Sequence, residues 1–600
     1  MKAKGQMSES MPLAIFLTLA GGLQDAYSYN CRGKVFANAQ TGNIVLLGQN
    51  LAEGNWGVAL HYLIPLLAFI SGVYVAVRIQ KLCKESEKIH WRQIVLVIQI
   101  ILLFLVGLFP QSMNVPANAM MSFSFSSYGT ESNYMGSKIN SDKTRASFDN
   151  AGFVLSSKIG NATALRYVNF GFNYHKAKSF YKNMSMGGNL GAYSQTFQMA
   201  EQARGIESWG SHPYNDDNVG WLSILGYDSW LISNLTTDNT GMPYKDEDGN
   251  QIKNSDGTPL YEMPGFYYGM YENGDATFRS EERGGIEQYD FNVSFNINDR
   301  VYLGLTIGAY AIDYNKYTFY DENYTGDYAG QGYNLTSWNR IQGSGFDFKF
   351  GAIVRPFEYS PLRIGLAVHT PTFYSLDYKT SALVQADVRN EVSGNIEQYD
   401  IYTPDMINGD MIRQFRLQTP WTYNVSLGYT IGNSWALGAE YEYEDYSSMK
   451  FKNPDDGFSD LFEYENSTTP MMKGVSTIRL GAEYKVIPQF ALRAGYNYST
   501  AIFNNDAYKD LPLNSIQTDT DFANTKALSN YTLGIGYRGS MFYADLAYKF
   551  SSYKENFYPF VEMEREVENG VEYRVLQGTP AVTKVKNTRS QVLLTLGLRF

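Results

Sequence analysis

The stretch Ser590–Phe600 reads S-Q-V-L-L-T-L-G-L-R-F and places an apolar residue at every second position from Val592 to the end. A period of two is that of a β-strand whose two faces meet different surroundings. An outer-membrane barrel shows such a strand ending on an aromatic residue, because its last strand closes against its first at the interfacial aromatic girdle. A soluble edge strand would show the same alternation, so the rest of the chain has to distinguish a membrane barrel from a soluble sheet.

The same alternation recurs in about fourteen segments from Met120 onward. They cover residues 121–126, 147–158, 168–175, 289–297, 301–312, 346–351, 363–370, 423–431, 437–444, 478–485, 492–498, 531–537, 544–550 and 592–600. An even number of this size lies within the range of bacterial outer-membrane barrels. The sequence therefore predicts a mainly β protein built on an antiparallel transmembrane β-barrel of about fourteen strands.

The connections between these segments alternate between short and long. Tight turns are expected at Asn298-Asp299, Gly432-Asn433, Ile487-Pro488 and Gly539-Ser540. Long polar stretches lie near 177–286, 313–344, 371–421, 447–475, 500–528 and 552–589. Short periplasmic turns that alternate with long outer loops are typical of a transmembrane barrel, whereas a soluble β-sandwich would not sort its connections so regularly.

Composition supports a barrel and excludes several other classes. The 600 residues include 48 Tyr, 35 Phe and 54 Gly, as expected for alternating strands flanked by aromatic belts. The net charge of -11 argues against nucleic acid as a partner. The two cysteines are Cys31 and Cys83, so the rest of the chain offers neither a disulfide framework nor a thiolate metal site.

The first 119 residues differ in character, because their apolar residues come in runs. Val58–Val77 and Ile94–Phe109 are long enough, or nearly so, to cross a membrane as helices; Met11–Tyr29 is a third candidate, and Thr41–Leu51 is shorter. We therefore expect a helical membrane segment of three to four helices. The basic residues between the two best candidates place that connection in the cytoplasm; they are Arg78, Lys81, Lys84, Lys88 and Arg92.

This N-terminal segment resembles the YoaK-like family of multi-pass membrane proteins, whose function is unknown. The resemblance rests on A-G-G-L-Q-D-A-Y at Ala20–Tyr27 and on V-F-A-N-A-Q-T-G-N-I-V-L-L-G at Val35–Gly48. The family continues with further helices, whereas here about two-thirds of its pattern is present before Asn118 and Ala119. The resemblance implies that residues 1–119 form an incomplete YoaK-like unit that favours the inner membrane.

Residues 120–600 resemble the FadL/TodX transporters. The longest matching stretch is F-G-A-I-V-R-P-F-E-Y-S-P-L-R-I-G-L-A-V-H-T-P-T-F-Y-S-L at Phe350–Leu376, and Leu417–Trp421, Glu440–Ser447 and Leu492–Tyr496 add to it. That family carries long-chain fatty acids and other hydrophobic compounds across the outer membrane through a fourteen-stranded barrel. The resemblance implies the same location, with a hydrophobic small molecule and membrane lipid as partners.

One departure from that family concerns its beginning. Its members start with a signal peptide and an N-terminal hatch that plugs the lumen, and neither is recognisable here; the YoaK-like segment takes their place. The join falls within Val115–Phe125. The roughly eleven residues between Pro110 and Met121 extend at most about 40 Å, too short to bridge two membranes. We therefore hypothesise a chimera of two coding regions. Alternatively, cleavage after Ala119 frees a barrel without a hatch.

Two groups of residues are candidates for handling a substrate. Charged residues on the inward face of the predicted strands must line a wet or paired lumen, because facing lipid would cost several kcal/mol each. These lumen candidates are Asp347, Lys349, Glu440, Glu442, Arg479, Glu483 and Arg493. An apolar group in the long 177–286 stretch is expected either to capture a hydrophobic substrate or to form the core of an ordered loop. Its members are Trp209, Trp221, Leu222, Ile224, Leu225 and Trp230.

The sequence carries no sign of an enzyme, a cofactor or a metal site. The histidines lack metal-ligand spacing, and no nucleophile or phosphate-binding motif occurs in a suitable setting; they are His61, His90, His175, His212 and His369. The acidic turns Asp246–Asn250 and Asn453–Gly457 lack the full ligand spacing of a calcium loop.

We therefore expect outer-membrane transport of a hydrophobic small molecule such as a long-chain fatty acid. The alternatives are a structural or adhesive barrel, or an inner-membrane protein of unknown function if the helical segment dominates. The strand that ends at Phe600 is expected to engage the barrel-assembly machinery.

Overall fold

A computed structural model describes two compact units, Met1–Asn114 and Val115–Phe600. The described residues are 21–26, 28–29, 34–82, 117–161, 163–246, 248–269, 274–568 and 571–599. Phe600 therefore lies outside them, as do the predicted helix Ile94–Phe109 and most of Met11–Tyr29.

The smaller unit is helical where it is described. A short helical segment covers residues 21–26, α2 spans Gln40–Ala52, and α3 spans Trp56–Leu82 with Pro65 inside it. The predicted segment Thr41–Leu51 lies in α2, and Val58–Val77 lies in α3. Within the described part of the chain, no helix combines the length and the apolarity that crossing a membrane requires. The three to four membrane helices stay a prediction.

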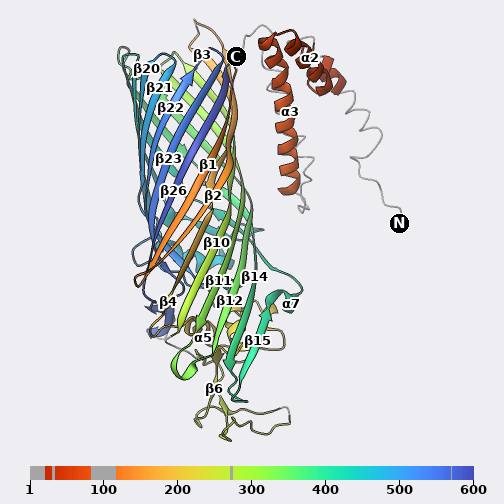
Figure 1. The fold of residues 1–600 in the computed structure, drawn as a ribbon, viewed down its shortest axis with the longest axis vertical. Coiled ribbons are helices and arrows are strands. Elements are labelled where there is room, and N and C mark those ends of the chain that lie inside the picture. The colour runs from red at the N-terminus through yellow and green to blue at the C-terminus, as the bar shows by residue number, and fades with distance from the viewer. Residues whose placement is uncertain are drawn as a thin grey trace, which may run out of the picture. The chain divides into compact units, whose positions relative to one another are not determined.

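The larger unit is a closed antiparallel barrel of fourteen strands, as predicted (Figure 1). Each strand pairs with the next around the ring, and the last pairs with the first. In ring order the strands are β1 (Ala117–Tyr134), β2 (Ser137–Lys158), β3 (Leu165–Ser179), β10 (Asp275–Ile297), β11 (Val301–Asn323), β12 (Gly332–Val354), β13 (Arg363–His369), β17 (Thr422–Ile431), β18 (Trp435–Asp445), β20 (Gly474–Ile487), β21 (Phe490–Ser499), β22 (Phe522–Arg538), β23 (Phe542–Tyr558) and β26 (Thr583–Arg599).

The closing seam joins β1 to β26. The register runs from Asn118 opposite Arg599 to Asn133 opposite Lys584. Side chains reinforce it inside the barrel, where the Ser122 and Thr595 hydroxyls lie 2.8 Å apart. The terminal strand therefore closes against the first predicted segment, residues 121–126, as a barrel requires.

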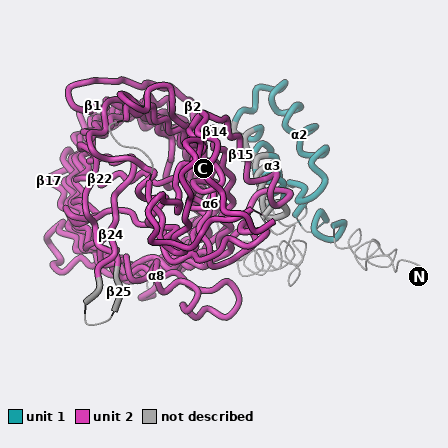
Figure 2. The backbone as a smooth tube through the Cα atoms, turned by 90° about the horizontal axis from the view of Figure 1, so that it is seen from below, with its two compact units in different colours: residues 1–114 teal, residues 115–600 magenta. Residues whose placement is uncertain are grey.

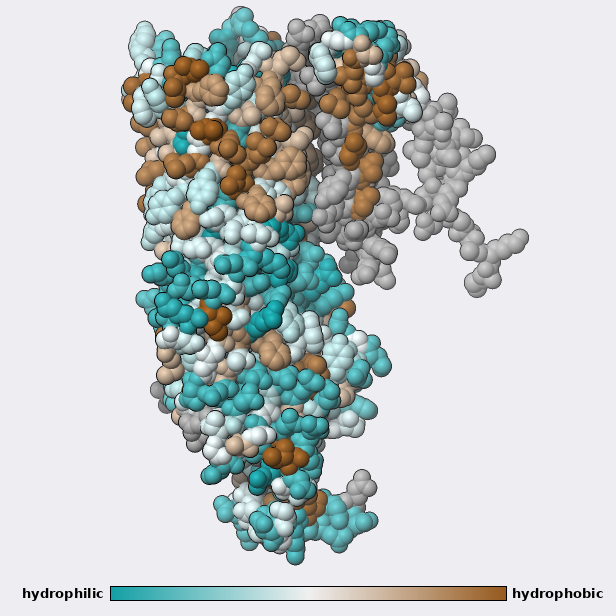
Figure 3. All heavy atoms as spheres, viewed as in Figure 1, coloured by the Kyte–Doolittle hydropathy of each residue, from teal (hydrophilic) through white to brown (hydrophobic). Residues whose placement is uncertain are grey.

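An apolar belt covers the visible face of the barrel at the end that carries the short turns (Figure 3). Its outward side chains are exposed, and most strands contribute to it; representative members are Phe123, Phe291, Leu305, Phe348, Leu427, Leu480, Leu492, Leu533, Leu546 and Leu594. Figure 3 shows that the outer surface becomes hydrophilic further along the barrel. We infer that the belt marks the part of the wall that contacts lipid.

The barrel wall continues well beyond the belt, so the predicted extents of the long outer loops are wrong. The 313–344 stretch holds the end of β11 and the start of β12, and the 552–589 stretch holds the end of β23 and the start of β26. Additional strands extend or flank the wall: β4 (Lys182–Asn189), β14 (Phe373–Arg389), β15 (Ile396–Tyr402), β16 (Met411–Gln418), β19 (Lys450–Lys452) and the hairpin β24 (Glu562–Glu568) with β25 (Val571–Gly578).

The alternation of β10 shows why these strand segments looked like loops. Within the belt, Phe291 points outward and Asp290 inward, whereas beyond the belt the inward residues Ala276 and Phe278 are the apolar ones. The outer face there meets water instead of lipid, so the polar residues lie outside and the apolar residues lie inside. β10 therefore continues without a break, but its apolar side chains lie on the outer face within the belt and on the inner face beyond it.

Apolar inward residues beyond the belt pack against the segment that connects β4 to β10. This segment contains α5 (Gln195–Ala203), α6 (Trp221–Asp228), the 3-10 turn η2 (Pro213–Asn215) and the short strands β5 (Ile232–Ser233), β6 (Leu235–Thr236), β7 (Met242–Pro243), β8 (Tyr261–Glu262) and β9 (Tyr268–Gly269). It forms one hydrophobic core with inward residues of five ring strands and of β14, which are Phe278, Tyr320, Leu335, Val384, Phe557 and Val585. We call this the loop core. Figure 2 shows the ring of strands end-on.

Smaller elements complete the outer connections. They are η3 (Gly326–Tyr328), α7 (Thr403–Ile407), η4 (Tyr446–Ser448), η5 (Asp460–Phe462), α8 (Glu463–Thr468) and η6 (Thr469–Met471).

Candidate functional site: the barrel interior

Within the belt, the inward faces of neighbouring strands are joined by ion pairs. Arg479 on β20 contacts both Glu440 and Glu442 on β18, with 2.7 Å between Arg479 Nη2 and Glu442 Oε1. Asn424 on β17 donates a 2.7 Å hydrogen bond to Glu440. One guanidinium therefore neutralises two carboxylates that lie on the same face of a strand.

A second group joins β20, β21 and β23. Arg493 donates from Nε to Glu483 at 2.8 Å and also contacts Asp545. Gly536 makes room for it, because a Cβ at that position would lie 2.8 Å from Arg493 Nη1. A side chain there would displace the guanidinium, so this glycine is required by close approach.

A third group gathers around Lys349 on β12. Its ammonium lies 2.9 Å from Asp290 on β10 and 4.0 Å from Asp347. The Tyr310 hydroxyl donates to Asp347 at 2.7 Å, and Gln288 donates to Asp290 at 2.8 Å. The other carboxylate oxygen of Asp347 is buried without a hydrogen-bond partner in the structure. This group carries buried charge on the inner wall.

The three groups take in all seven lumen candidates of the sequence analysis, and each candidate contacts an oppositely charged residue. Sequence reasoning missed their partners, which are Asn424, Asp290, Tyr310, Gln288 and Asp545. Four of these partners lie within predicted strand segments and Gln288 directly precedes one, so extending the alternation by one residue would have found all five. Arg479 keeps 39% of its side chain exposed, so this part of the wall is open to water.

The six apolar loop candidates come together in or beside the loop core. Trp221 is 2% exposed, and Leu222, Ile224 and Leu225 are 0% exposed. Trp209 and Trp230 pack against its edge, and Trp209 stacks on Tyr227 with ring centroids 4.8 Å apart. Because the four α6 residues are buried, they fit the second of the two expected roles, the core of an ordered loop. The two tryptophans at the edge of the loop core remain partly exposed.

A buried ion pair ties the segment that connects β21 to β22 to the barrel wall. Lys316 on β11 lies 2.6 Å from Asp519 and 2.7 Å from Asp521, and Lys509 donates to the Asp519 carbonyl at 2.6 Å. Burial raises the pKa of Asp519, but the Lys316 and Lys509 ammonium groups more than reverse this and hold that pKa at about 2. We call these four residues the latch.

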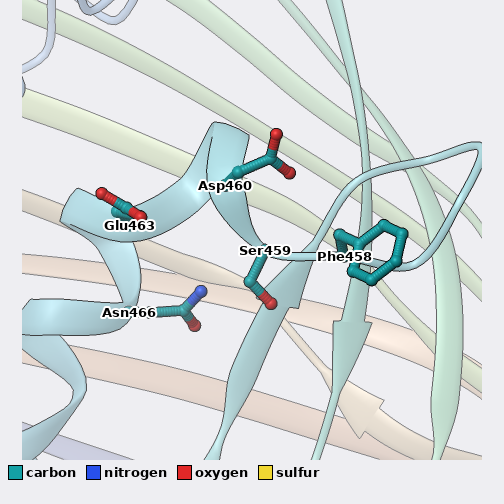
Figure 4. A pocket seen from close by; sticks show the side chains of 5 residues that line it. All are labelled: Phe458, Ser459, Asp460, Glu463 and Asn466. Carbon is teal, nitrogen blue, oxygen red and sulfur yellow. The ribbon is translucent and has the colours of Figure 1, made fainter.

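One cavity in the outer connections, of about 440 Å³, is lined by Phe458, Ser459, Asp460, Glu463 and Asn466 (Figure 4). Its polar groups serve the local fold, since Asn466 donates to the Phe451 carbonyl at 2.9 Å and Asp460 accepts from Asn453 at 2.5 Å. Across the described ranges, no three His, Cys, Asp or Glu side chains are grouped to hold a metal ion.

These features define an outer-membrane β-barrel: a closed ring with an apolar outer belt, short turns at one end and a charge-paired interior. Residues 268–514 match the model of the outer membrane protein transport protein family (OMPP1/FadL/TodX), which confirms the FadL/TodX resemblance. Residues 13–141 match a family described as a protein of unknown function, DUF1275, in agreement with the YoaK-like resemblance of the N-terminal segment.

Solved barrels resemble the chain at low identity. The toluene transporter TodX of Pseudomonas putida is 11% identical, with 80% of this chain and 89% of that chain covered and a TM-score of 0.36. A FadL homologue of Pseudomonas aeruginosa is 12% identical, with 80% of this chain and 90% of that chain covered and a TM-score of 0.39. The toluene transporter TbuX of Ralstonia pickettii is 11% identical, with 80% of this chain and 90% of that chain covered and a TM-score of 0.33. No curated protein matches the chain.

Proposed function

We propose that the barrel carries hydrophobic small molecules, long-chain fatty acids among them, across the outer membrane. The observation that carries this proposal is the loop core, which packs apolar side chains against inward residues of six strands. A pore for general diffusion of polar solutes needs a continuous aqueous lumen, whereas apolar side chains occupy the inside of this wall beyond the belt. The match of residues 268–514 to a family of outer-membrane transport proteins supports the same conclusion.

The two groups of candidates then take successive roles. Trp209 and Trp230, at the edge of the loop core, offer apolar surface where a hydrophobic molecule first binds. Deeper inside, the ion-paired wall built around Lys349, Arg479 and Arg493 forms the path. Because those charges are neutralised by one another, they do not trap an apolar molecule, which is released toward the periplasm.

Uptake by the full chain reconstituted in lipid vesicles tests the proposal. We expect labelled oleate to enter at a rate that saturates, while a labelled sugar is excluded. Trp209→Ala should slow oleate entry several-fold at limiting concentration. Trp435→Ala, which removes an exposed belt tryptophan, is the matched control and should leave entry unchanged. A correctly inserted barrel that admits no oleate would instead favour a structural or adhesive role.

We further propose that the chain joins two coding regions near residue 115. The compact units separate between Asn114 and Val115, and β1 begins at Ala117. Sequencing reads that cross codons 110–125 without a break would refute an assembly artefact. Cleavage after Ala119 would remove the first three residues of β1 and leave Met120–Tyr134 to close the barrel. N-terminal sequencing of the outer-membrane species distinguishes a cleaved chain from an intact one.

A further inference from the structure

Beyond the belt, lysines gather on three consecutive strands of the ring, β22, β23 and β26. Lys554 on β23 and Lys586 on β26 are Cα partners in the register of the sheet. On β22 the register shifts at a bulge, which places Lys526 opposite Lys554. Lys584 lies two residues from Lys586 on the same face of β26. We call these four residues the lysine patch; its centre is the row across the three strands.

The alternation of exposed and buried residues shows that the patch points away from the lumen. On β26, Lys584 and Lys586 are exposed, whereas Val585 between them is 2% exposed and belongs to the loop core. On β23, Lys554 is exposed, whereas the next residue, Glu555, is 5% exposed. The patch therefore belongs to the outer surface of the wall, which is hydrophilic beyond the belt (Figure 3).

The ammonium groups of the patch are held by neutral partners. Lys526 donates to the side-chain oxygen of Asn524 at 2.9 Å, and Lys584 donates to that of Asn556 at 3.0 Å. Within the described residues, no salt bridge joins any of the four lysines to a carboxylate. Burial, together with the charges of Lys473 and Lys584, lowers the pKa of Lys526. Like charges that stand directly opposite one another destabilise a sheet, so the row has an electrostatic cost that the described chain does not offset.

Carboxylates occur only at the margins of the patch. On the β1 side, Glu131 is the Cα partner of Lys586, but its Oε1 lies 3.7 Å from the Lys138 ammonium. Asp142, on β2, lies one strand further away. On the β22 side, the connecting segment contributes Asp506, which is exposed. The row across the three strands therefore presents positive charge alone.

The height of the patch on the wall indicates what surrounds it. Tyr531 on β22 and Phe550 on β23 are Cα partners at the outer limit of the belt, where aromatic side chains meet the membrane interface. Lys554 lies four residues beyond Phe550, about 13 Å along the strand and, at a tilt of about 40°, about 10 Å along the barrel axis. The interfacial layer of a bilayer is about 5–8 Å thick on each side, and a flexible lysine stem lets the ammonium reach back toward it. The patch therefore lies at the level of large lipid headgroups.

We propose that the lysine patch binds the phosphate groups of the glycolipids that form the outer leaflet around the barrel. Phosphates supply the negative charge that relieves the repulsion within the row, and an ammonium binds phosphate as a point charge without a fixed geometry. A headgroup that carries its phosphates on a sugar core extends far enough from the hydrocarbon to meet the row. The inference concerns the lipid that surrounds the barrel and does not depend on what the barrel transports.

Equilibrium binding to the folded full chain in a non-ionic detergent tests the patch. The probe is a fluorescently labelled rough lipopolysaccharide, in which lipid A carries a short phosphorylated sugar core, and its dephosphorylated form is the comparison. The test variant is Lys554→Gln/Lys586→Gln, and Lys554→Arg/Lys586→Arg keeps the charge. The matched control is Arg279→Gln/Arg340→Gln, which removes two exposed cations that have carboxylate partners elsewhere on the wall. Heat-modifiable migration on gels verifies that each barrel is folded.

A lysine near a charged lipid surface contributes about fivefold to affinity, so we expect the test variant to bind the lipopolysaccharide at least tenfold more weakly than the wild type. The arginine variant and the control variant should bind it as the wild type does. Equal affinity of the wild type for the phosphorylated and dephosphorylated forms would overturn the recognition of phosphate. An equal loss in the control variant, or no loss in the test variant, would overturn the assignment to the patch. Displacement of the lipopolysaccharide by an equal concentration of inorganic phosphate would overturn the lipid as the source of the phosphate.

Discussion

Removing Lys316 should release the segment that connects β21 to β22 from the barrel wall. In Lys316→Met, the methionine fills similar volume but leaves Asp519, 2% exposed, and Asp521, 10% exposed, without their ammonium partner. Breaking a buried ion pair on one side costs about 3–5 kcal/mol, because the remaining charge stays desolvated. Lys509, 3.8 Å from Asp519, offsets part of that cost. We therefore expect the free energy of opening this segment to fall by about 3 kcal/mol. The fraction of molecules in which the segment is detached from the wall then rises roughly 100-fold.

Amide hydrogen exchange of residues 515–521 measures this opening. The Thr518 hydroxyl, 2.7 Å from that of Ser337, lies between the segment and the wall, so protection there reports release of the latch. The control is Arg340→Ala, which breaks the exposed Arg340–Asp313 pair at 3.4 Å and should change exchange by less than a factor of about three. Unchanged exchange in Lys316→Met, or an equal effect of the control, would refute the reasoning.

Three further changes have defined outcomes. Leu225→Ala removes a side chain that is 0% exposed and should destabilise the loop core by about 2–5 kcal/mol, seen as faster exchange in α6; unchanged exchange would contradict the packing. Leu594→Arg puts a charge on the belt and should cost about 2–4 kcal/mol in the unfolding free energy of the barrel in lipid, whereas Lys586→Arg should be neutral. Because the pKa of Asp519 is held at about 2, below its ordinary 3.8, the latch contributes fully above pH 3.8 and weakens as the pH falls toward 2; exchange of residues 515–521 that first rose near neutral pH would disprove this.

The barrel strands and their inward charged residues could be predicted from the sequence, because the same alternation of outward and inward side chains determines both. Within the belt, lipid outside and water inside force every strand into the same alternation, so Phe291 and Asp290 reveal their faces directly. Counting such segments yields all fourteen strands. Closure of β1 on β26 follows from their being the first and last of them.

The wall beyond the belt was missed because the rule changes there. Ala276 and Phe278 continue the alternation of β10 on the opposite face, and a search for outward apolar residues passes over them. The reversal in phase between positions 280 and 289 is a signal that the sequence contains. The latch is different, because Lys316 and Asp519 are 203 residues apart and no local pattern relates them.

The seam between β1 and β26 carries a kinetic consequence for assembly. Ser122 and Thr595 meet across 473 positions of sequence, and bringing ends so far apart together costs about 5.5 kcal/mol of chain entropy. Every other neighbouring pair in the ring can form at shorter range, so this pair closes last. Until then Ala117–Tyr134 and Thr583–Arg599 are two long open edges, each able to pair with a foreign strand. Shielding those two edges is therefore the chief task of whatever factor escorts the unclosed sheet to its membrane.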